Sequence, residues 1–320
     1  MNFRYSLIIP VYGNSDNLPD LMVALRNLAM QLGRSFEVIF VVDGSPDKCW
    51  NLLRQALPNE SFASQLLLHS RNFGSFPAIR TGFEAARGQF LAAMAADLQE
   101  PPELIIDFYR KLETGEADVV FGKRESRDDP MLSRFLSNIF WSIYRKFVIP
   151  DMPPGGVDVF GCSRQVLEIL FKINESNSSL VGQLFWVGYR RAFLPYKRQK
   201  REKGKSQWKF NKRINYLLDS IFSFSDLPVK MLLWSGAFVG MISFLLGTIT
   251  LFARLMGIIN VPGYTMQILF LSFVFSTLLF TQGVIGCYLW RCFENTKSRP
   301  LSVVSIQDIY DGKQETYSHD

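Results

Sequence analysis

Short apolar runs alternate with longer mixed segments through the N-terminal part of the chain. The runs predict strands at residues 5–11, 36–42, 65–69, 89–95 and 118–122. The segments between them predict helices at residues 17–33, 47–57, 77–87 and 101–114. This alternation is typical of an α/β fold in which helices cover both faces of a mainly parallel sheet. In such a sheet, ligands bind beyond the carboxyl ends of the strands.

The C-terminal third contains two long stretches without charged side chains. No Asp, Glu, Lys, Arg or His occurs at residues 231–253 or 255–290. With about 1.5 Å of rise per residue, a helix over the first stretch is roughly 35 Å long, enough to cross a hydrocarbon core of about 30 Å. The second stretch is too long for one span and divides near Pro262 and Gly263, where a turn is expected. Because core helices of soluble proteins rarely exceed about 18 residues without a charge, we predict two transmembrane helices rather than two buried ones.

Basic residues flank the two predicted spans unevenly. Residues 190–213, before the first span, contain eleven Lys or Arg and one acid, Glu202, whereas the connecting loop has Arg254 alone. Since basic residues concentrate on the cytoplasmic side, both termini are predicted to be cytoplasmic. The predicted organisation is a cytoplasmic domain at 1–227, a two-helix transmembrane region at 228–293 and a cytoplasmic tail at 294–320. In a bacterium, this would be a protein of the inner membrane.

Two amphipathic stretches, at about residues 131–148 and 209–226, precede the first span. In the first, apolar residues recur at helical spacing, while Arg134, Arg145 and Lys146 lie off the apolar stripe. Most such stripes face a protein core, but the neighbouring cations and spans also favour helices that lie in the headgroup layer of a lipid bilayer. The sequence leaves both interpretations open.

The charge of the chain is concentrated in one segment. In total, 35 Lys and Arg stand against 29 Asp and Glu among 320 residues, a net charge of +6. Residues 190–213 alone carry a net charge of +10, so the rest of the chain carries a net charge of −4. Because this segment adjoins a membrane span and lacks a recognisable nucleic-acid-reading motif, anionic headgroups or a loop over a diphosphate are favoured over nucleic acid. The four cysteines form no CxxC pattern, which argues against a zinc site or a disulfide scaffold.

Several common catalytic arrangements are missing from the sequence. No GxGxxG follows the first predicted strand and no GxxxxGK[ST] occurs, so the usual phosphate-binding loops are missing. There is no GxSxG, and the two histidines are His69 and His319, which makes serine-histidine chemistry and a histidine-ligated metal unfavourable. Carboxylate and amide oxygens are the groups that remain.

Such groups follow the predicted strands at the edge where ligands are expected. Asp97 and Gln99 end the fourth strand two residues apart, so we expect both side chains to leave the strand on the same face. Their oxygens suit a hard divalent cation such as Mg²⁺ or Mn²⁺, particularly when substrate phosphates complete its shell. Asp43 ends the second strand, where it could accept hydrogen bonds from a base or form an Asx turn that supports the Gly44-Ser45 loop.

Six short motifs occur in order along the chain and together resemble a known family. They are Pro10-Val11-Tyr12, Val42-Asp43-Gly44-Ser45, Ser70-Arg71-Asn72-Phe73-Gly74, Asp97-Leu98-Gln99-Glu100-Pro101-Pro102-Glu103, Trp186-Val187-Gly188-Tyr189-Arg190 and Ser223-Phe224-Ser225-Asp226-Leu227-Pro228. The chain resembles, over about residues 5–300, the family-2 glycosyltransferases that load a sugar onto a polyprenyl phosphate, such as dolichol-phosphate mannose synthase and bacterial polyprenyl-phosphate glucosyltransferases. The resemblance implies a Rossmann-like GT-A domain and two membrane helices. It also implies metal-assisted, inverting transfer of a sugar from a UDP- or GDP-linked donor to the lipid phosphate, and suggests a homo-oligomer.

The same resemblance implies roles for individual residues. Pro10, Tyr12 and Asp43 would line the nucleotide, and Asp97 and Gln99 would hold the metal and the diphosphate. Asp158 matches a family aspartate near the reaction centre, as a base or a positioning group, and a plain surface or loop aspartate is the alternative. Arg124 would bind the nucleotide sugar, and Arg134 and Arg201 the acceptor phosphate. For these cations, a solvated surface role is the alternative.

The chain departs from the family pattern at several of these motifs. Ala95 stands where the first aspartate of Asp-x-Asp is usual, and Gly13-Asn14 replaces Asn-Glu. Phe160 replaces an arginine and Gln207 a lysine. Loss of one carboxylate predicts weaker metal binding or an unusual donor sugar, because Asp97, Gln99 and phosphate oxygens must suffice. The alternative is a catalytically impaired relative that serves as a binding or scaffold subunit in a membrane glycan pathway.

Overall fold

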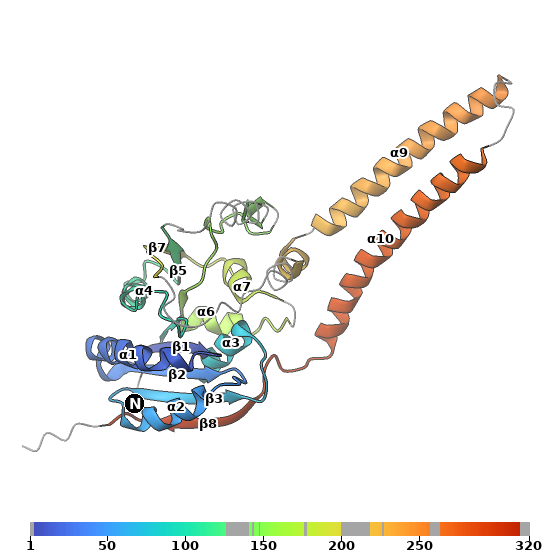
Figure 1. Ribbon diagram of the computed structural model, residues 1–320. Helices are drawn as coiled ribbons and strands as arrows, with labels where there is room; N and C mark the ends of the chain where they lie inside the picture. The colour runs from blue at the N-terminus through green and yellow to red at the C-terminus, as the bar shows by residue number, and fades with distance from the viewer. Residues whose placement is uncertain are drawn as a thin grey trace, which may run out of the picture.

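One eight-stranded sheet organises the domain from which two long helices project (Figure 1). The computed structural model describes residues 3–125, 141–142, 144–146, 148–175, 178–199, 218–225, 227–256 and 263–313. The strand order is β7-β5-β6-β4-β1-β2-β3-β8. The strands are β1 (Tyr5–Val11), β2 (Phe36–Val42), β3 (Ala63–His69), β4 (Phe90–Ala93), β5 (Val119–Arg124), β6 (Phe160–Ser163), β7 (Arg191–Tyr196) and β8 (Val304–Tyr310).

The sheet is mainly parallel, as predicted, with three antiparallel pairings. Strand β1 lies parallel to both β2 and β4, β2 lies parallel to β3, and β5 lies parallel to β7. Strand β6 runs antiparallel to β4 and β5, and β8 runs antiparallel to β3. All five strands expected from the sequence are present. The parallel strands β1, β2 and β3 end at one edge of the sheet, with Val11 opposite Val42, so the loops that follow them lie together.

Helices cover both faces of the sheet, and this explains why its central strands are almost wholly apolar. The helices are α1 (Leu18–Leu32), α2 (Cys49–Ala56), α3 (Ser75–Ala85), α4 (Glu103–Glu113), α6 (Arg164–Leu170) and α7 (Leu180–Trp186), with short 3₁₀ turns η1 (Ser15–Asn17), η2 (Gly33–Ser35) and η3 (Leu57–Asn59). Helices α1, α2 and α4 pack over one face around Leu7 and Ile9. Helices α3, α6 and α7 pack over the other face around Ile8. Every residue of β2 is buried, as is typical of a parallel strand covered on both sides.

A strand from the far C-terminus completes the sheet. A tail is expected at residues 294–320, but residues 304–310 form β8 along the free edge of β3, with Ile309 opposite Gln65. Most side chains of β8 are exposed, as on an edge strand. The segment after the two long helices therefore returns to the domain that begins the chain (Figure 1).

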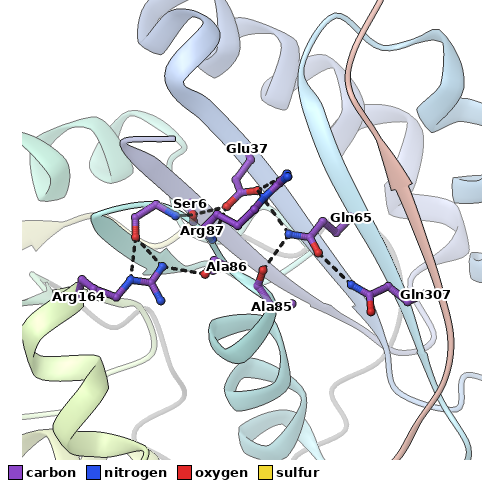
Figure 2. Close-up of polar contacts among 9 residues, drawn as sticks. Ser6, Glu37, Gln65, Ala85, Ala86, Arg87, Arg164 and Gln307 are labelled. Carbon is purple, nitrogen blue, oxygen red and sulfur yellow. Dashed lines mark hydrogen bonds and ion pairs between the residues drawn. The ribbon is translucent and has the colours of Figure 1, made fainter. Parts of the chain in front are cut away.

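A buried polar network near the amino ends of the strands ties β8 into the domain (Figure 2). Glu37 is fully buried and accepts hydrogen bonds from Ser6 Oγ at 2.7 Å and from Arg87 Nε at 2.9 Å. Gln307 of β8 donates to Gln65 Oε1 at 3.1 Å, and Gln65 Nε2 lies 3.4 Å from Glu37. Because a buried charge persists only when it is paired and hydrogen-bonded, Arg87 serves as the counter-ion of Glu37.

Two long apolar helices follow the domain, and they break where the sequence predicts a turn. Helix α9 spans Leu227–Leu255 and α10 spans Tyr264–Thr296, with Gly263 at the N-cap of α10. Among the described residues, one stretch, Phe273–Thr296, is both long and apolar enough to cross a membrane, with a mean hydropathy of 1.5. A shorter apolar stretch, Leu227–Val239, lies in α9. The second span and the cytoplasmic orientation stay predictions.

A helical segment at residues 218–224 connects the domain to α9. It packs on α7, where Phe224 lies so close to Gly182 that an added Cβ there would be 2.5 Å from the Phe224 ring. Asp219 pairs with Arg291 near the end of α10 at 2.7 Å. The interface helices predicted at about 131–148 and 209–226 lie largely outside the described residues.

Candidate active site

The turn after β4 carries the first pair of predicted site residues. Strand β4 ends at Ala93, before Asp97 and Gln99, so the expectation that these two residues end the strand is wrong, and strand alternation does not direct their side chains. Instead, Leu98 adopts a left-handed backbone with φ of +53°, and Gln99 N lies 3.4 Å from Asp97 Oδ1. A residue other than glycine in this conformation costs about 1–2 kcal/mol, and such strain concentrates at functional sites.

The chain that follows β7 closes over this turn. Arg198 donates to Gln99 Oε1, and Gln199 N donates to the Gln99 carbonyl oxygen at 2.9 Å. Gln99 Nε2 lies 3.4 Å from the Gln199 carbonyl oxygen. The amide oxygen predicted to bind a cation is therefore oriented by an arginine from the start of the basic segment.

Strands β5 and β7 place a second group of polar side chains beside this turn. Arg124 and Tyr196 are register partners at the ends of these strands, and both contact Asp158, which precedes β6. Arg124 forms an ion pair with Asp158, and the Tyr196 hydroxyl donates to Asp158 Oδ2 at 3.3 Å. Burial lowers the pKa of Arg124, and neighbouring Arg198 lowers it further. Arg124 and Asp158, predicted separately, thus belong to one cluster.

Glu100 belongs to the same cluster, and the sequence reading assigned it no role. It is 2% exposed, and its buried Oε2 atom has no hydrogen-bond partner among the described residues. Burial raises the pKa of the Glu100 carboxyl and Asp97 adds to this effect, while Arg198 and Arg124 oppose it. In the sequence, the feature that points to Glu100 is its position directly after Gln99 in the motif at residues 97–103. Tyr196 and Arg198 cannot be singled out from the sequence, because they lie within the basic segment 190–213, whose charged residues are expected to face solvent.

Asp43 is tied to a neighbouring loop. Its carboxylate accepts hydrogen bonds from the backbone N–H groups of Phe73 and Gly74 and contacts His69 Nδ1, each at 2.8 Å. Asp43 is 3% exposed. These contacts resemble the supporting role that the sequence left open as an alternative, although the loop supported is 70–74. Contact between Asp43 and a base stays a prediction.

A hydrogen bond joins the loop after β1 to the loop after β2. Strand β1 carries Pro10, which is half-buried like Tyr12. Gly13 N donates to Ser45 Oγ at 2.8 Å, and Ser45 Oγ donates to Asp47 Oδ1 at 2.7 Å. Burial works to raise the pKa of Asp47, but hydrogen bonds from Cys49, Ser45 and Ser15 outweigh it and hold the pKa at about 2. Arg134 and Arg201 lie outside the described residues.

Comparisons with known proteins cover nearly the whole chain. The model of the family described as Glycosyl transferase family 2 matches residues 6–168. An uncharacterized glycosyltransferase of Synechocystis sp. is 32% identical over 306 residues, which are 95% of this chain and 96% of that protein. The bactoprenol glucosyl transferase of Shigella phage SfX is 30% identical over 302 residues, which are 94% of this chain and 98% of that protein.

A solved structure shows a looser similarity. The mannosyltransferase PcManGT from Pyrobaculum calidifontis, in complex with GDP-Man and Mn²⁺, is 18% identical and has a TM-score of 0.45. The similarity covers 61% of this chain and 55% of that one. The family match over half of the chain, together with relatives at 30% identity or more over 94–95% of it, decides the classification. This chain belongs to glycosyl transferase family 2 and is a glycosyltransferase.

Proposed function

We propose that this glycosyltransferase moves a sugar from a nucleotide sugar to a polyprenyl phosphate. The observation that carries the proposal is the 30% identity with a bactoprenol glucosyl transferase over 94% of the chain, because that extent includes the two apolar helices as well as the domain. A lipid phosphate acceptor also fits a crevice that is joined to apolar helices through residues 218–224.

The donor would bind at the carboxyl edge of the sheet. Pro10, Tyr12 and the loops held by Asp43 would line the nucleotide. The residues after β4 fit a hard divalent cation, since Asp97 offers carboxylate oxygens and the buried Glu100 Oε2 has no hydrogen-bond partner among the described residues. Gln99 Oε1, which accepts a hydrogen bond from Arg198, would exchange that arginine for the metal. Within the described residues, no group of three or more His, Cys, Asp or Glu side chains could hold a metal ion, so donor phosphates would complete the shell. Bound Mg²⁺ or Mn²⁺ would stabilise the negative charge of the departing diphosphate.

The remaining cluster suits the transfer itself. In an inverting reaction, an acceptor phosphate oxygen forms a bond to the anomeric carbon while the bond from that carbon to the diphosphate breaks. The acceptor is already an anion, so orientation and charge stabilisation matter more than a strong base. Arg124 would contact the diphosphate, and Asp158, held by Arg124 and Tyr196, would position the reacting groups.

The membrane arrangement is part of the proposal. Helices α9 and α10 would form two spans with the domain and both termini on the cytoplasmic side, and Arg134 and Arg201 would contact the acceptor phosphate. Protease added to the outside of sealed cells should then leave the domain before Met231 intact. Rapid external cleavage there would contradict this orientation. Self-association stays a prediction.

The transfer reaction is tested with membranes that contain the protein. Nucleotide sugars are supplied one at a time with Mg²⁺ or Mn²⁺ and a polyprenyl phosphate. We expect a glycolipid product with at least one donor, and we expect Asp97→Asn to abolish it. Asp107→Asn is the matched control, because Asp107 lies on the exposed face of α4 and pairs with Arg110 of the same helix.

A second candidate function rests on Ala95, which stands where the family pattern has a carboxylate. A chain without that carboxylate could bind nucleotide sugars as a subunit of a membrane glycan pathway without transferring them. Nucleotide binding without product from any donor would favour this role. Product that depends on Asp97 would exclude it.

A further inference from the structure

A chain of polar contacts leads from the segment after α10 to loop 70–74, at the carboxyl edge of the sheet. Ser302 Oγ lies 2.6 Å from Thr81 Oγ1 of α3, and Thr81 Oγ1 lies 3.0 Å from His69 Nε2. His69 Nδ1 lies 2.8 Å from Asp43 Oδ1. Asp43 holds the N–H groups of Phe73 and Gly74, each at 2.8 Å. The side chains of Thr81, His69 and Asp43 therefore connect Ser302 to the backbone of loop 70–74.

The chemistry of these groups allows one continuous direction of donation. An ionised carboxylate only accepts, so with a neutral imidazole Nδ1 donates to Asp43 and Nε2 accepts from the Thr81 hydroxyl. The Thr81 oxygen then accepts from Ser302. His69 is 2% exposed and Thr81 is 4% exposed, so water does not readily replace a lost partner. A missing contact in such a buried network costs more than one at the surface.

The arrangement of aspartate, histidine and hydroxyl also occurs in hydrolases, but burial excludes that use here. A nucleophilic hydroxyl must reach substrate, whereas Thr81 of α3 is 4% exposed and its hydroxyl contacts Ser302 and His69. The contacts therefore act on the position of groups and not on a bond to be cleaved.

The end of the chain also forms hydrogen bonds with the backbone of β3 and of the residue that follows it. Ser70 N donates to the Val303 carbonyl oxygen at 3.0 Å, and Ser305 Oγ donates to the Leu68 carbonyl oxygen at 3.0 Å. Residues 302–305 thus contact the end of β3 on both sides of His69. Loop 70–74 is therefore held by Asp43 at Phe73 and Gly74 and by Val303 at Ser70.

We propose that Ser302 and Thr81 are positioning residues for the donor nucleotide, acting through His69 and Asp43 on loop 70–74. Ser302, on the segment that returns from α10, then contributes to the donor site. This inference rests on the proposed function, since it takes the crevice beside Asp43 as the place where the nucleotide binds.

The test uses full-length protein in detergent with a nucleoside diphosphate as the binding probe. Ser302→Ala removes the outermost hydroxyl, and Ser302→Thr keeps one. Ser305→Ala is the matched control, because Ser305 lies in the same segment and donates to Leu68 but has no contact with Thr81. Measurements are the dissociation constant of the nucleoside diphosphate, KM and kcat for the sugar donor, and hydrogen exchange at the Phe73 and Gly74 amides.

We expect Ser302→Ala and Thr81→Val to raise the dissociation constant and the donor KM by about 2- to 10-fold, the range that one hydrogen bond supports. The kcat should change less than about twofold. Hydrogen exchange at the Phe73 and Gly74 amides should be faster in both variants. Ser302→Thr, which keeps a hydroxyl, should have the dissociation constant, KM and exchange rates of the unmodified protein. Equal effects of Ser302→Ala and Ser305→Ala, or a loss of kcat at constant KM, would overturn the proposal.

Failure of the proposed function has a different signature. In that case, the unmodified protein binds no nucleoside diphosphate, while hydrogen exchange still reports on the polar chain. Faster exchange in Ser302→Ala would then support the connection to loop 70–74 without a donor. Unchanged exchange would refute it directly.

Discussion

The loop after β2 turns on Gly44, and replacing this residue with alanine should disturb the crevice. Gly44 has φ of +56°, and an added Cβ would lie 2.5 Å from Asn72 N and 2.8 Å from Arg71 Cα. These are backbone atoms of loop 70–74, so no side chain can rotate away to relieve the contact. The loop itself would have to move away from Asp43.

The cost has two parts that the structure separates. A left-handed backbone at a residue other than glycine costs about 1–2 kcal/mol. Overpacking against atoms that cannot shift freely costs about 1–3 kcal/mol more. Gly115→Ala is the matched control, because Gly115 has φ of +69° but no atom within 4 Å of an added Cβ. The difference in unfolding free energy between the two variants should therefore be about 1–3 kcal/mol.

Thermal unfolding and donor kinetics together test this reasoning. Gly44→Ala should lower the Tm by several degrees more than Gly115→Ala, at about 2–4 °C per kcal/mol for a domain of this size. It should also raise the donor KM, while Gly115→Ala should leave the KM unchanged. If the two variants lose the same stability and neither changes the KM, the close packing of the two loops does not shape the donor site.

Three further predictions concern other parts of the domain. Arg87→Met leaves the buried Glu37 without its counter-ion and should cost about 3 kcal/mol in urea unfolding, near the low end for buried pairs because Arg87 is 41% exposed; a loss below about 1 kcal/mol would contradict this. The folded pKa of Asp47, about 2 against an ordinary 3.8, means that its stabilisation is present above 3.8 and is lost as pH falls toward 2. Asp47→Asn should therefore show a flatter dependence of Tm on pH in that window, and an unchanged dependence would count against the assigned hydrogen bonds. Gly182→Ala should push the 218–224 segment off α7 and increase protease cleavage there, and Phe224→Ala in the same chain should reverse this; no rescue would mean that the ring is not the obstacle.

The central strands could be predicted from the sequence because burial on both faces leaves a continuous apolar run. Strands β1 and β2 have the predicted bounds, and every residue of β2 is buried. Strand β8 could not be found in this way. Its residues are mostly exposed and mix Val304 and Ile306 with Gln307 and Asp308, so only pairing with β3 identifies it as a strand.

The candidate site was predicted at the level of motifs but not of contacts. Asp97, Gln99, Arg124 and Asp158 were named from the sequence, and the structure brings them into one region. Their partners could not be predicted, because Tyr196 ends β7 and Arg198 follows it, both more than 70 residues further along the chain than Arg124. Glu100 was passed over because nothing in the sequence marks a carboxyl as buried and unpartnered.

The position of β8 has a consequence for how the protein is made. Leu68 and Ser305 form a hydrogen bond across 237 positions of the chain, so the free edge of β3 stays bare until both long helices have left the ribosome. An uncovered strand edge invites pairing with other chains during synthesis. The sheet can be completed only after α9 and α10 have been synthesised, so its last strand joins the domain late.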